Sequence, residues 1–139
     1  MRIRLPSRGN VLMAIDYSKS VLVVNDMPSM TQIITSLLRK IGFTNIEAAS
    51  NGWEALAKMK NEKFGLVVSD WQMEPMDGQE LLETIRAIPT IASTPFIMVT
   101  AHPERTRIVS AKKAGANGYI GIPFTLATLK SKITETLDP

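Results

Sequence analysis

Five short apolar runs alternate with five amphipathic stretches from Ser20 to Leu137, and no other feature of this sequence constrains its fold as strongly. The first run, SVLVVN, is rich in β-branched residues and has the nearly continuous apolarity of a strand buried on both faces. Strands that alternate with helices predict a parallel sheet covered by helices on both faces. The five runs are residues 20–25, 45–49, 64–69, 95–100 and 118–122.

The amphipathic stretches carry apolar residues at helical spacing, as Ile34 and Leu38 do in the first of them. Gly42 provides a stop for that helix, and the Asn51–Gly52 pair precedes the second helix. The third helix is predicted from Leu81, Leu82 and Ile85, the fourth from about residue 103 to 114, and the last from Leu126, Leu129, Ile133 and Leu137.

The composition agrees with one globular domain and excludes several kinds of site. The chain has 139 residues, of which 45% are hydrophobic and 21% charged, enough for an ordinary domain with a core. The absence of cysteine excludes disulfides, thiolate chemistry and cysteine zinc sites, and the single histidine, His102, excludes a multi-histidine metal centre. The net charge of +3 is dispersed, without the basic run typical of a nucleic-acid interface.

Residues 1–19 are predicted to be a loosely ordered basic extension, and residues 20–139 the domain. Three arginines in the first eight residues could be mistaken for the start of a signal peptide. The apolar run Val11–Ile15 is too short for a signal core or a membrane span. We therefore expect no membrane insertion and a cytoplasmic location. Met13 is an alternative start that the sequence leaves open.

Polar residues follow the predicted strands at the carboxyl edge of the sheet, where ligands bind in this class of fold. Asn25 and Asp26 follow the first strand, Asp70 the third and Thr100 the fourth. Two carboxylates that converge on one edge repel each other unless a cation or a proton intervenes. Mg2+ suits such a place because it uses one or two carboxylates, a carbonyl and several waters. Asp70 is also a candidate nucleophile for a phosphoryl group, with Thr100 as a hydrogen-bond donor to it.

Four segments surround these positions in order: VLVVNDMPSM, LVVSDWQMEPMDG, FIMVTA and AGANGYIGIPFT. Together they resemble the receiver domain of bacterial response regulators, most closely the single-domain, CheY-like chemotaxis type. The resemblance runs from about Ser20 to Leu137. It implies an α/β, flavodoxin-like (βα)5 fold, a three-layer sandwich whose five-stranded parallel sheet has the strand order 2-1-3-4-5.

The resemblance also implies a role for each strand-end residue. Asp70 would be the phosphoacceptor, and Thr100 would follow the phosphoryl group. Asp26, Asp70 and the backbone carbonyl of Gln72 would hold Mg2+, with Asn25 contributing through a water molecule.

Further roles are implied around this site. Tyr119 would be the aromatic switch residue on the output face, and the peptide bond between Ile122 and Pro123 would be cis, an isomer that is rare in general. Gln72 and His102 lie two residues beyond Asp70 and Thr100. Their side chains would either tune the access of the hydrolytic water or be ordinary exposed loop residues.

The site departs from the family pattern at two positions. Asn25 stands where an acidic residue is typical, and Ile122 where a lysine precedes the proline. The usual three carboxylates and one lysine sum to a formal charge of −2, and Asp26 with Asp70 also sum to −2, so attraction for Mg2+ is retained. A charge-assisted contact to the phosphoryl group is lost, worth roughly 1.5–3 kcal/mol. We expect phosphorylation with weaker or rerouted coupling to the output face.

The last two helices carry an excess of basic side chains, which are either a solvated surface or a binding face for an acidic partner. A binding face would centre on Tyr119 and would combine the fourth helix, the fifth strand and the last helix. The basic residues are Arg105, Arg107, Lys112, Lys113, Lys130 and Lys132, against Glu104, Glu135 and Asp138.

The leading hypothesis is a stand-alone receiver of a two-component phosphorelay. It would take a phosphoryl group on Asp70 from a histidine kinase or phosphotransfer protein and signal by binding another protein, without acting as an enzyme on a separate substrate. The alternative is a degenerate receiver that binds its partner without phosphorylation. Flavin binding fits poorly because NDMPSMT has no glycine, and a haloacid-dehalogenase phosphatase fits poorly because the paired D-x-D is absent.

Overall fold

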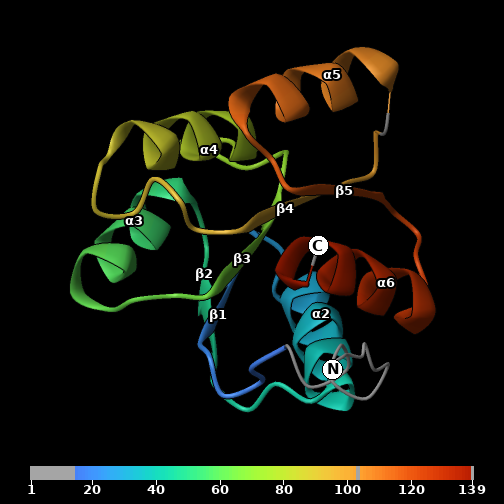
Figure 1. Ribbon diagram of the computed structural model, residues 1–139. Coiled ribbons are helices and arrows are strands. Elements are labelled where there is room, and N and C mark those ends of the chain that lie inside the picture. Colours follow the sequence, from blue (N-terminus) through green and yellow to red (C-terminus); the bar gives the residue numbers. More distant parts are fainter. Residues whose placement is uncertain (1–14, 103, 139) are drawn as a thin grey trace, which may run out of the picture.

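The apolar runs form the strands that the sequence predicts. The computed structural model describes residues 15–102 and 104–138, and in it five parallel strands make one sheet. They are β1 (Val21–Val24), β2 (Ile46–Ala49), β3 (Leu66–Asp70), β4 (Phe96–Thr100) and β5 (Gly118–Gly121). Their spatial order is β2-β1-β3-β4-β5, so the predicted order is confirmed (Figure 1).

The register of the sheet brings the carboxyl ends of its strands to one edge. Val24 of β1 is level with Ser69 of β3, and Asp70 is level with Val99 of β4. Every residue of β1 and of β4 is buried, whereas the outer strands β2 and β5 are only partly covered. The near-continuous apolarity of the inner strands follows from this burial on both faces.

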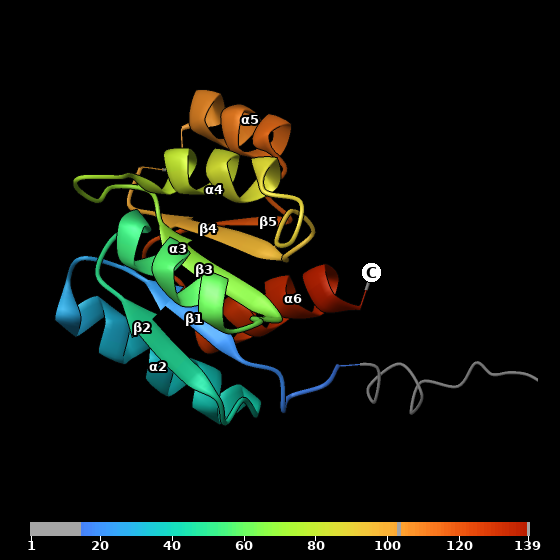
Figure 2. The ribbon, with the colours of Figure 1, turned by 90° about the vertical axis from the view of Figure 1, so that its left-hand side faces the viewer.

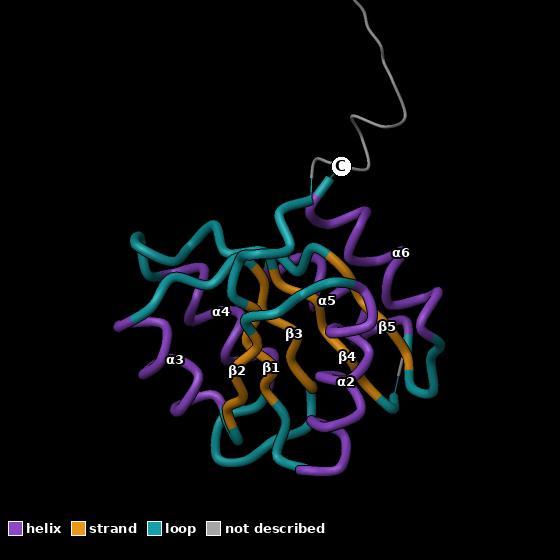
Figure 3. The backbone as a smooth tube through the Cα atoms, turned by 90° about the horizontal axis from the view of Figure 1, so that it is seen from below, coloured by secondary structure: helices purple, strands orange, loops and turns teal. Residues whose placement is uncertain are grey.

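Helices cover both faces of the sheet. They are α2 (Pro28–Ile41), α3 (Gly52–Asn61), α4 (Gly78–Ala87), α5 (Arg105–Ala114) and α6 (Leu126–Leu137). Helices α2 and α6 lie on one face and α3 and α4 on the other, with α5 beside α4 (Figures 1 and 2). Seen from below, the strands form the middle layer, and helices such as α3, α4 and α6 lie outside it (Figure 3). No helix among residues 15–102 and 104–138 is long and apolar enough to cross a membrane.

Two apolar clusters, one on each face, hold the layers together. Val21 and Val23 join the cluster beneath α2 and α6, and Leu22 and Val24 join the cluster beneath α3 and α4. Successive strand residues thus face opposite layers. A fully buried aliphatic side chain contributes about 1.5–3 kcal/mol to burial free energy, so both faces of each inner strand stabilise the fold.

The helix boundaries follow local sequence signals. Gly42 ends α2 with a φ of 136°, in the region that favours glycine, and its N–H donates to the carbonyls of Leu38 and Arg39. Asp77 caps α4 by accepting the Glu80 N–H at 2.8 Å, while the Glu80 carboxylate accepts the Asp77 N–H at 3.1 Å. This reciprocal capping box fixes the start of α4 directly after the loop that follows Asp70.

Two predicted boundaries are corrected. Ile15 is only 8% exposed, and the Tyr17 ring packs edge-on against Phe43 with 5.1 Å between centroids. Residues 15–19 therefore pack on the domain instead of forming a loose extension, and the expectation for residues 1–14 lies outside the described residues. Helix α5 begins at Arg105 instead of about residue 103, because the backbone of Glu104 is extended; residue 103 itself lies outside the described residues.

Arg86 links two loops at the amino edge of the sheet, the edge opposite to that of Asp70 and Thr100. Its guanidinium donates to the carbonyls of Gly115, Ala92 and Thr94 and to Oδ1 of Asn117, at 2.7 to 3.1 Å. Its acceptors come from the connections that follow α4 and α5. Burial lowers the pKa of this guanidinium, and the hydrogen bonds compensate its lost hydration.

Candidate functional site

The strand-end residues meet at the carboxyl edge of the sheet, as predicted. Asp70 ends β3, Thr100 ends β4, and Asn25 and Asp26 follow β1, which lies beside β3. Asp26 is exposed and Asp70 is half-buried, while Asn25 and Thr100 are buried. The structure thus brings together a buried polar floor and two carboxylates that solvent can reach.

The Asp70 carboxylate is held in an environment that disfavours its charge. Burial raises the pKa of Asp70, and the negative charge of Asp26 raises it further. The backbone N–H groups of Trp71 and Gln72 oppose this rise by hydrogen bonding to the carboxylate. A bound cation, or a positively charged group of a partner, would therefore stabilise the ionised Asp70 carboxylate.

Asn25 supports the loop that carries Asp26. Its Oδ1 accepts the Met27 N–H at 2.8 Å, which forms an Asx turn between β1 and α2. This side chain is only 4% exposed, so the turn is fixed from inside the protein. The observed bond gives Asn25 a structural task in addition to the water-mediated metal contact that the sequence suggests.

Thr100, His102 and Tyr119 are linked at the end of β4. The Thr100 hydroxyl accepts the His102 N–H at 3.0 Å, and the Tyr119 hydroxyl lies 3.5 Å from the His102 carbonyl oxygen. Burial raises the pKa of the Tyr119 hydroxyl, and the neighbouring Thr100 hydroxyl opposes that rise. The predicted switch tyrosine is thus in contact with the loop that follows the predicted phosphoryl-contacting threonine.

Gly78 allows the loop after Asp70 to close over the end of β3. Its N–H donates to the Trp71 carbonyl at 2.8 Å. A Cβ at this position would overlap the carbonyl oxygen of Asp70 and lie 3.0 Å from the Cα of Trp71. Only glycine fits this close approach without moving the backbone of the site.

An open pocket lies next to Asp70, lined by Asp26, Trp71, Gln72, Met73, Glu74, Asp77 and Arg107. The residues around it fit a Mg2+ ion of the predicted kind. Asp26 and Asp70 supply two carboxylates, and burial followed by the charge of Asp26 raises the pKa of Asp70; oxygen ligands suit this hard cation. In the part of the chain that the structure describes, no three or more acidic, histidine or cysteine side chains are arranged to hold a metal ion by themselves, so water would complete the coordination.

The family model for the response regulator receiver domain matches residues 21–134. The chain belongs to the response regulator receiver family. The receiver is 42% identical over 118 residues to the chemotaxis protein CheY-3 of Vibrio cholerae, covering 85% of this chain and 91% of the relative. It is 41% identical over 118 residues to the chemotaxis protein CheY of Pseudomonas aeruginosa, covering 85% of this chain and 95% of that one.

Solved structures share the fold of this receiver. The Vibrio cholerae chemotaxis protein CheY4 superimposes with a TM-score of 0.80 at 31% identity, over 86% of this chain and 99% of that chain. The receiver domain of the sensor histidine kinase PA1611 of Pseudomonas aeruginosa has a TM-score of 0.79 at 23% identity, over 88% and 99% of the two chains. That structure is described with a magnesium ion coordinated in its active-site cleft. The CheY-type flavodoxin-like fold and the assignment to the receivers of two-component signalling are therefore confirmed.

Ile122 takes part in the core of this receiver. Its side chain packs on the apolar cluster beneath α2 and α6, and its N–H donates to the Thr100 carbonyl at 2.8 Å. The peptide bond to Pro123 is cis, as the resemblance to the receiver family implies, and the Glu74–Pro75 bond is also cis. The strand end thus presents an apolar side chain that packs on the core, at the position where the family pattern has a lysine.

Two residues of the site were not identified from the sequence. Trp71 packs on the core, and its ring also makes an edge-to-face contact with Tyr119, with 6.4 Å between centroids. Arg107 lines the pocket beside Asp26, whereas the sequence predicts only a solvated surface or a partner-binding face for the basic residues of this helix. The sequence position of Arg107, near the start of the predicted fourth helix, could have indicated that it lies near the loop after β4. The sequence could not indicate the direction in which its side chain points.

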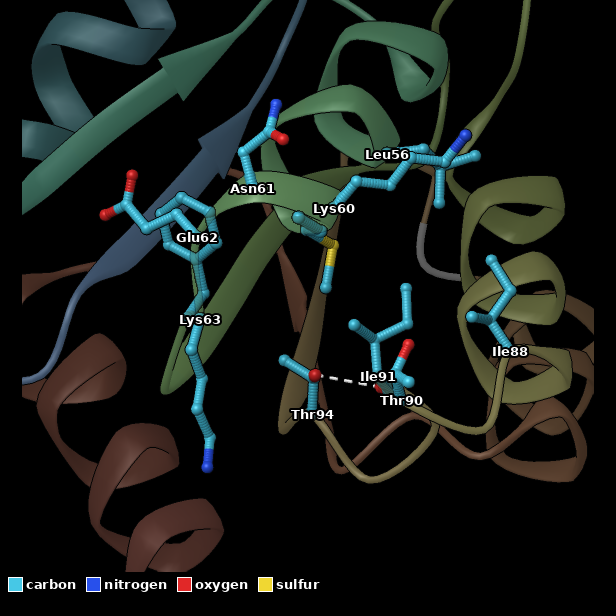
Figure 4. A pocket seen from close by; sticks show the side chains of 11 residues that line it. Leu56, Lys60, Asn61, Glu62, Lys63, Ile88, Thr90, Ile91 and Thr94 are labelled. Atoms are coloured by element: carbon cyan, nitrogen blue, oxygen red, sulfur yellow. Dashed lines mark hydrogen bonds between the residues drawn. The ribbon is translucent and has the colours of Figure 1, made fainter.

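A second pocket lies at the opposite end of the sheet, far along the strands from Asp70. It is lined by Leu56, Met59, Lys60, Asn61, Glu62, Lys63, Phe64, Ile88, Thr90, Ile91 and Thr94. Figure 4 shows Ile88 and Ile91 on one side and Lys60 and Glu62 on the other, with Thr94 bonded to the Ile91 carbonyl at 2.8 Å. Its polar groups are scattered along the rim and do not converge, in contrast to those at the strand ends.

Proposed function

We propose that Asp70 of this receiver accepts a phosphoryl group from a phosphohistidine of a histidine kinase or phosphotransfer protein, and that the receiver then signals by binding another protein. The observation that carries this proposal is the half-buried Asp70 carboxylate at the end of β3, beside Asp26 and level with the end of β4. A phosphodonor can reach this position, and the two neighbouring carboxylates attract a cation.

In the proposed reaction, an oxygen of the Asp70 carboxylate attacks the phosphorus, and a new O–P bond forms as the N–P bond of the phosphohistidine breaks. The electron pair of the broken bond returns to the imidazole nitrogen, which takes a proton from solvent. Thr100 ends the neighbouring strand β4, and its hydroxyl would donate to a phosphoryl oxygen. Asp70 acts on its own modification, and no separate substrate is turned over.

Mg2+ would be held by the carboxylates of Asp26 and Asp70 and by the Gln72 carbonyl, with Asn25 reached through water. The bound ion would neutralise negative charge on the phosphoryl oxygens during transfer. Asp26 contributes its charge from an exposed position, so it can accept the ion without reorganising the core.

The output surface would be formed by α5, β5 and α6. A hollow on this surface is lined by Tyr119, Lys112 and Lys132, together with Ile108, Ala116, Asn117, Gly118 and Glu135. Lys132 is engaged with Glu135 at 3.7 Å, and Lys112 is exposed. These features favour a partner that presents an acidic group next to an apolar side chain.

Gln72 and His102 would tune the lifetime of the phosphorylated form. Both side chains are exposed at the ends of the loops that flank the site. His102 is also 3.8 Å from Glu104, so its position is partly held by a neighbour. Changing either residue is expected to alter the dephosphorylation rate while leaving the fold intact.

A second candidate function is a binding module that works without phosphorylation, which the apolar Ile122 favours. Titration of Mg2+ and then beryllofluoride, a non-covalent mimic of the phosphoryl group, separates the two. A Trp53→Phe variant leaves Trp71 as the single tryptophan reporter, because the chain has two tryptophans. A response that is lost in Asp70→Asn supports the phosphoacceptor, and no response to either ligand supports the constitutive module.

A further inference from the structure

The guanidinium of Arg107 reaches the pocket beside Asp26 and Gln72 from helix α5. Its Nε lies 3.5 Å from Oε2 of Glu104, and its Cζ lies 5.1 Å from the centroid of the Trp71 ring. Its Nη1 is buried and has no hydrogen-bond partner within residues 15–102 and 104–138. A buried N–H group without an acceptor is destabilising. An anion bound in the pocket could provide the acceptor that this group lacks.

Among the described residues that line this pocket, Arg107 is the one that carries a positive charge. Ile122 packs on the cluster beneath α2 and α6 and brings no charge to the end of β5. The ion pair that Arg107 makes in this state is with Glu104. A phosphoryl group would add negative charge and would extend from the carboxylate, so it would bring acceptor oxygens nearer to the pocket.

We propose that Arg107 binds the phosphoryl group on Asp70 and supplies the positive charge that Ile122 cannot. This inference rests on the proposed phosphorylation of Asp70. A guanidinium presents parallel N–H donors that match phosphoryl oxygens, and Nη1 would gain its missing acceptor. The contact with Glu104 is exposed and long, so it yields readily to a stronger anion.

The contact would also provide a route from the site to the output surface. Arg107 belongs to α5, and the Trp71 ring that it covers touches Tyr119. Moving the guanidinium from Trp71 toward the phosphoryl group would pull on α5 and uncover the ring next to Tyr119. Coupling would then run through α5 in place of the strand-end lysine.

The test compares Arg107→Gln with Arg105→Gln in the full chain. Both variants remove one positive charge from the first turn of α5, but the Arg105 side chain is exposed and does not line the pocket. Beryllofluoride binding is measured by calorimetry in saturating Mg2+. Arg107→Gln is expected to weaken beryllofluoride binding roughly ten- to hundredfold, and Arg105→Gln by no more than about twofold.

Mg2+ titrated alone distinguishes an anion-binding role from a structural one. Removing a nearby positive charge leaves Mg2+ affinity unchanged or raises it, whereas a collapsed pocket would weaken Mg2+ binding as well. Equal beryllofluoride affinities for the two variants would overturn the inference, and so would a parallel loss of Mg2+ affinity in Arg107→Gln. If the unmodified chain does not bind beryllofluoride, or if Asp70→Asn binds it equally well, the proposed function itself fails and the inference with it.

Discussion

The Arg107 guanidinium lies over the Trp71 ring at 5.1 Å from its centroid, so a side chain of α5 is packed against the residue that directly follows Asp70. The same ring touches Tyr119 on β5. A cation over an aromatic face contributes about 0.5–2 kcal/mol, which is comparable with one charge-assisted hydrogen bond. The guanidinium is therefore held loosely enough to be redirected by an anion bound at Asp70.

Asp70→Asn is predicted to stabilise the metal-free protein at neutral pH. The pKa of Asp70 is raised in the folded state, mainly by burial, so the ionised carboxylate costs stability above its ordinary unfolded-state value, 3.8. This cost is relieved as the pH falls through the raised folded-state pKa. The variant's advantage in urea unfolding should therefore be largest near neutrality and should shrink in mild acid.

Asp16→Asn is the matched control for this pH dependence. Hydrogen bonds from Ser18 lower the pKa of Asp16, so its ionised form stabilises the fold and the substitution should bring no gain at neutral pH. If Asp70→Asn were no more stable than the unmodified chain in the absence of Mg2+, the account of the Asp70 environment would be wrong.

Gly78→Ala is predicted to lower the free energy of unfolding by about 1–3 kcal/mol and to weaken Mg2+ binding. The added Cβ overlaps the Asp70 carbonyl oxygen, so the backbone that carries the carboxylate must move. Gly118→Ala is the control, because its Cβ would meet only side chains, at 3.3 Å from Ile97 and 3.4 Å from Thr136. Equal Mg2+ affinity in the two variants would contradict this reading of Gly78.

Ile122→Lys is predicted to lower the free energy of unfolding by about 1–2 kcal/mol while tightening beryllofluoride binding roughly tenfold. The loss of stability follows from the packing of Ile122 on the cluster beneath α2 and α6, and the gain in binding from the added ammonium group. Ile122→Met keeps the apolar volume and should change neither quantity strongly. A lysine variant that binds beryllofluoride no better than the methionine variant would refute the role assigned to this position.

Arg86→Lys is predicted to cost about 2–4 kcal/mol of unfolding free energy, because a lysine cannot satisfy the four acceptors that the guanidinium fork reaches. Arg39→Lys, at an exposed position of α2, should cost almost nothing. Chemical unfolding of both variants checks the difference. Similar midpoints would show that the hydrogen bonds of Arg86 contribute little net stability.

The sequence was sufficient for the fold because its strands are short, apolar and buried on both faces, and because stops such as Gly42 and caps such as Asn51 act locally. Parallel topology then placed Asp26, Asp70 and Thr100 at one edge without knowledge of any side-chain contact. Those parts of the site depend on chain order alone.

The contacts of Arg86 and Arg107 could not be predicted in this way. Both side chains are long and flexible, and each reaches a neighbour that is distant in sequence: Arg86 bonds to Gly115, and Arg107 covers Trp71. The packing of residues 15–19 was missed for a related reason, because Ile15 is buried only once Phe43 and the helices beneath it are in place. Tertiary packing decides such positions, and local periodicity carries no signal for it.

The proposed function depends on the transfer of a phosphoryl group to Asp70. The direct measurement is intact mass spectrometry of the chain after incubation with Mg2+ and a small-molecule phosphodonor, followed by peptide mapping of the modified residue. We predict one phosphoryl group per chain, located on Asp70, and no adduct in Asp70→Asn. An unmodified chain, or an adduct that persists in Asp70→Asn, would contradict the account.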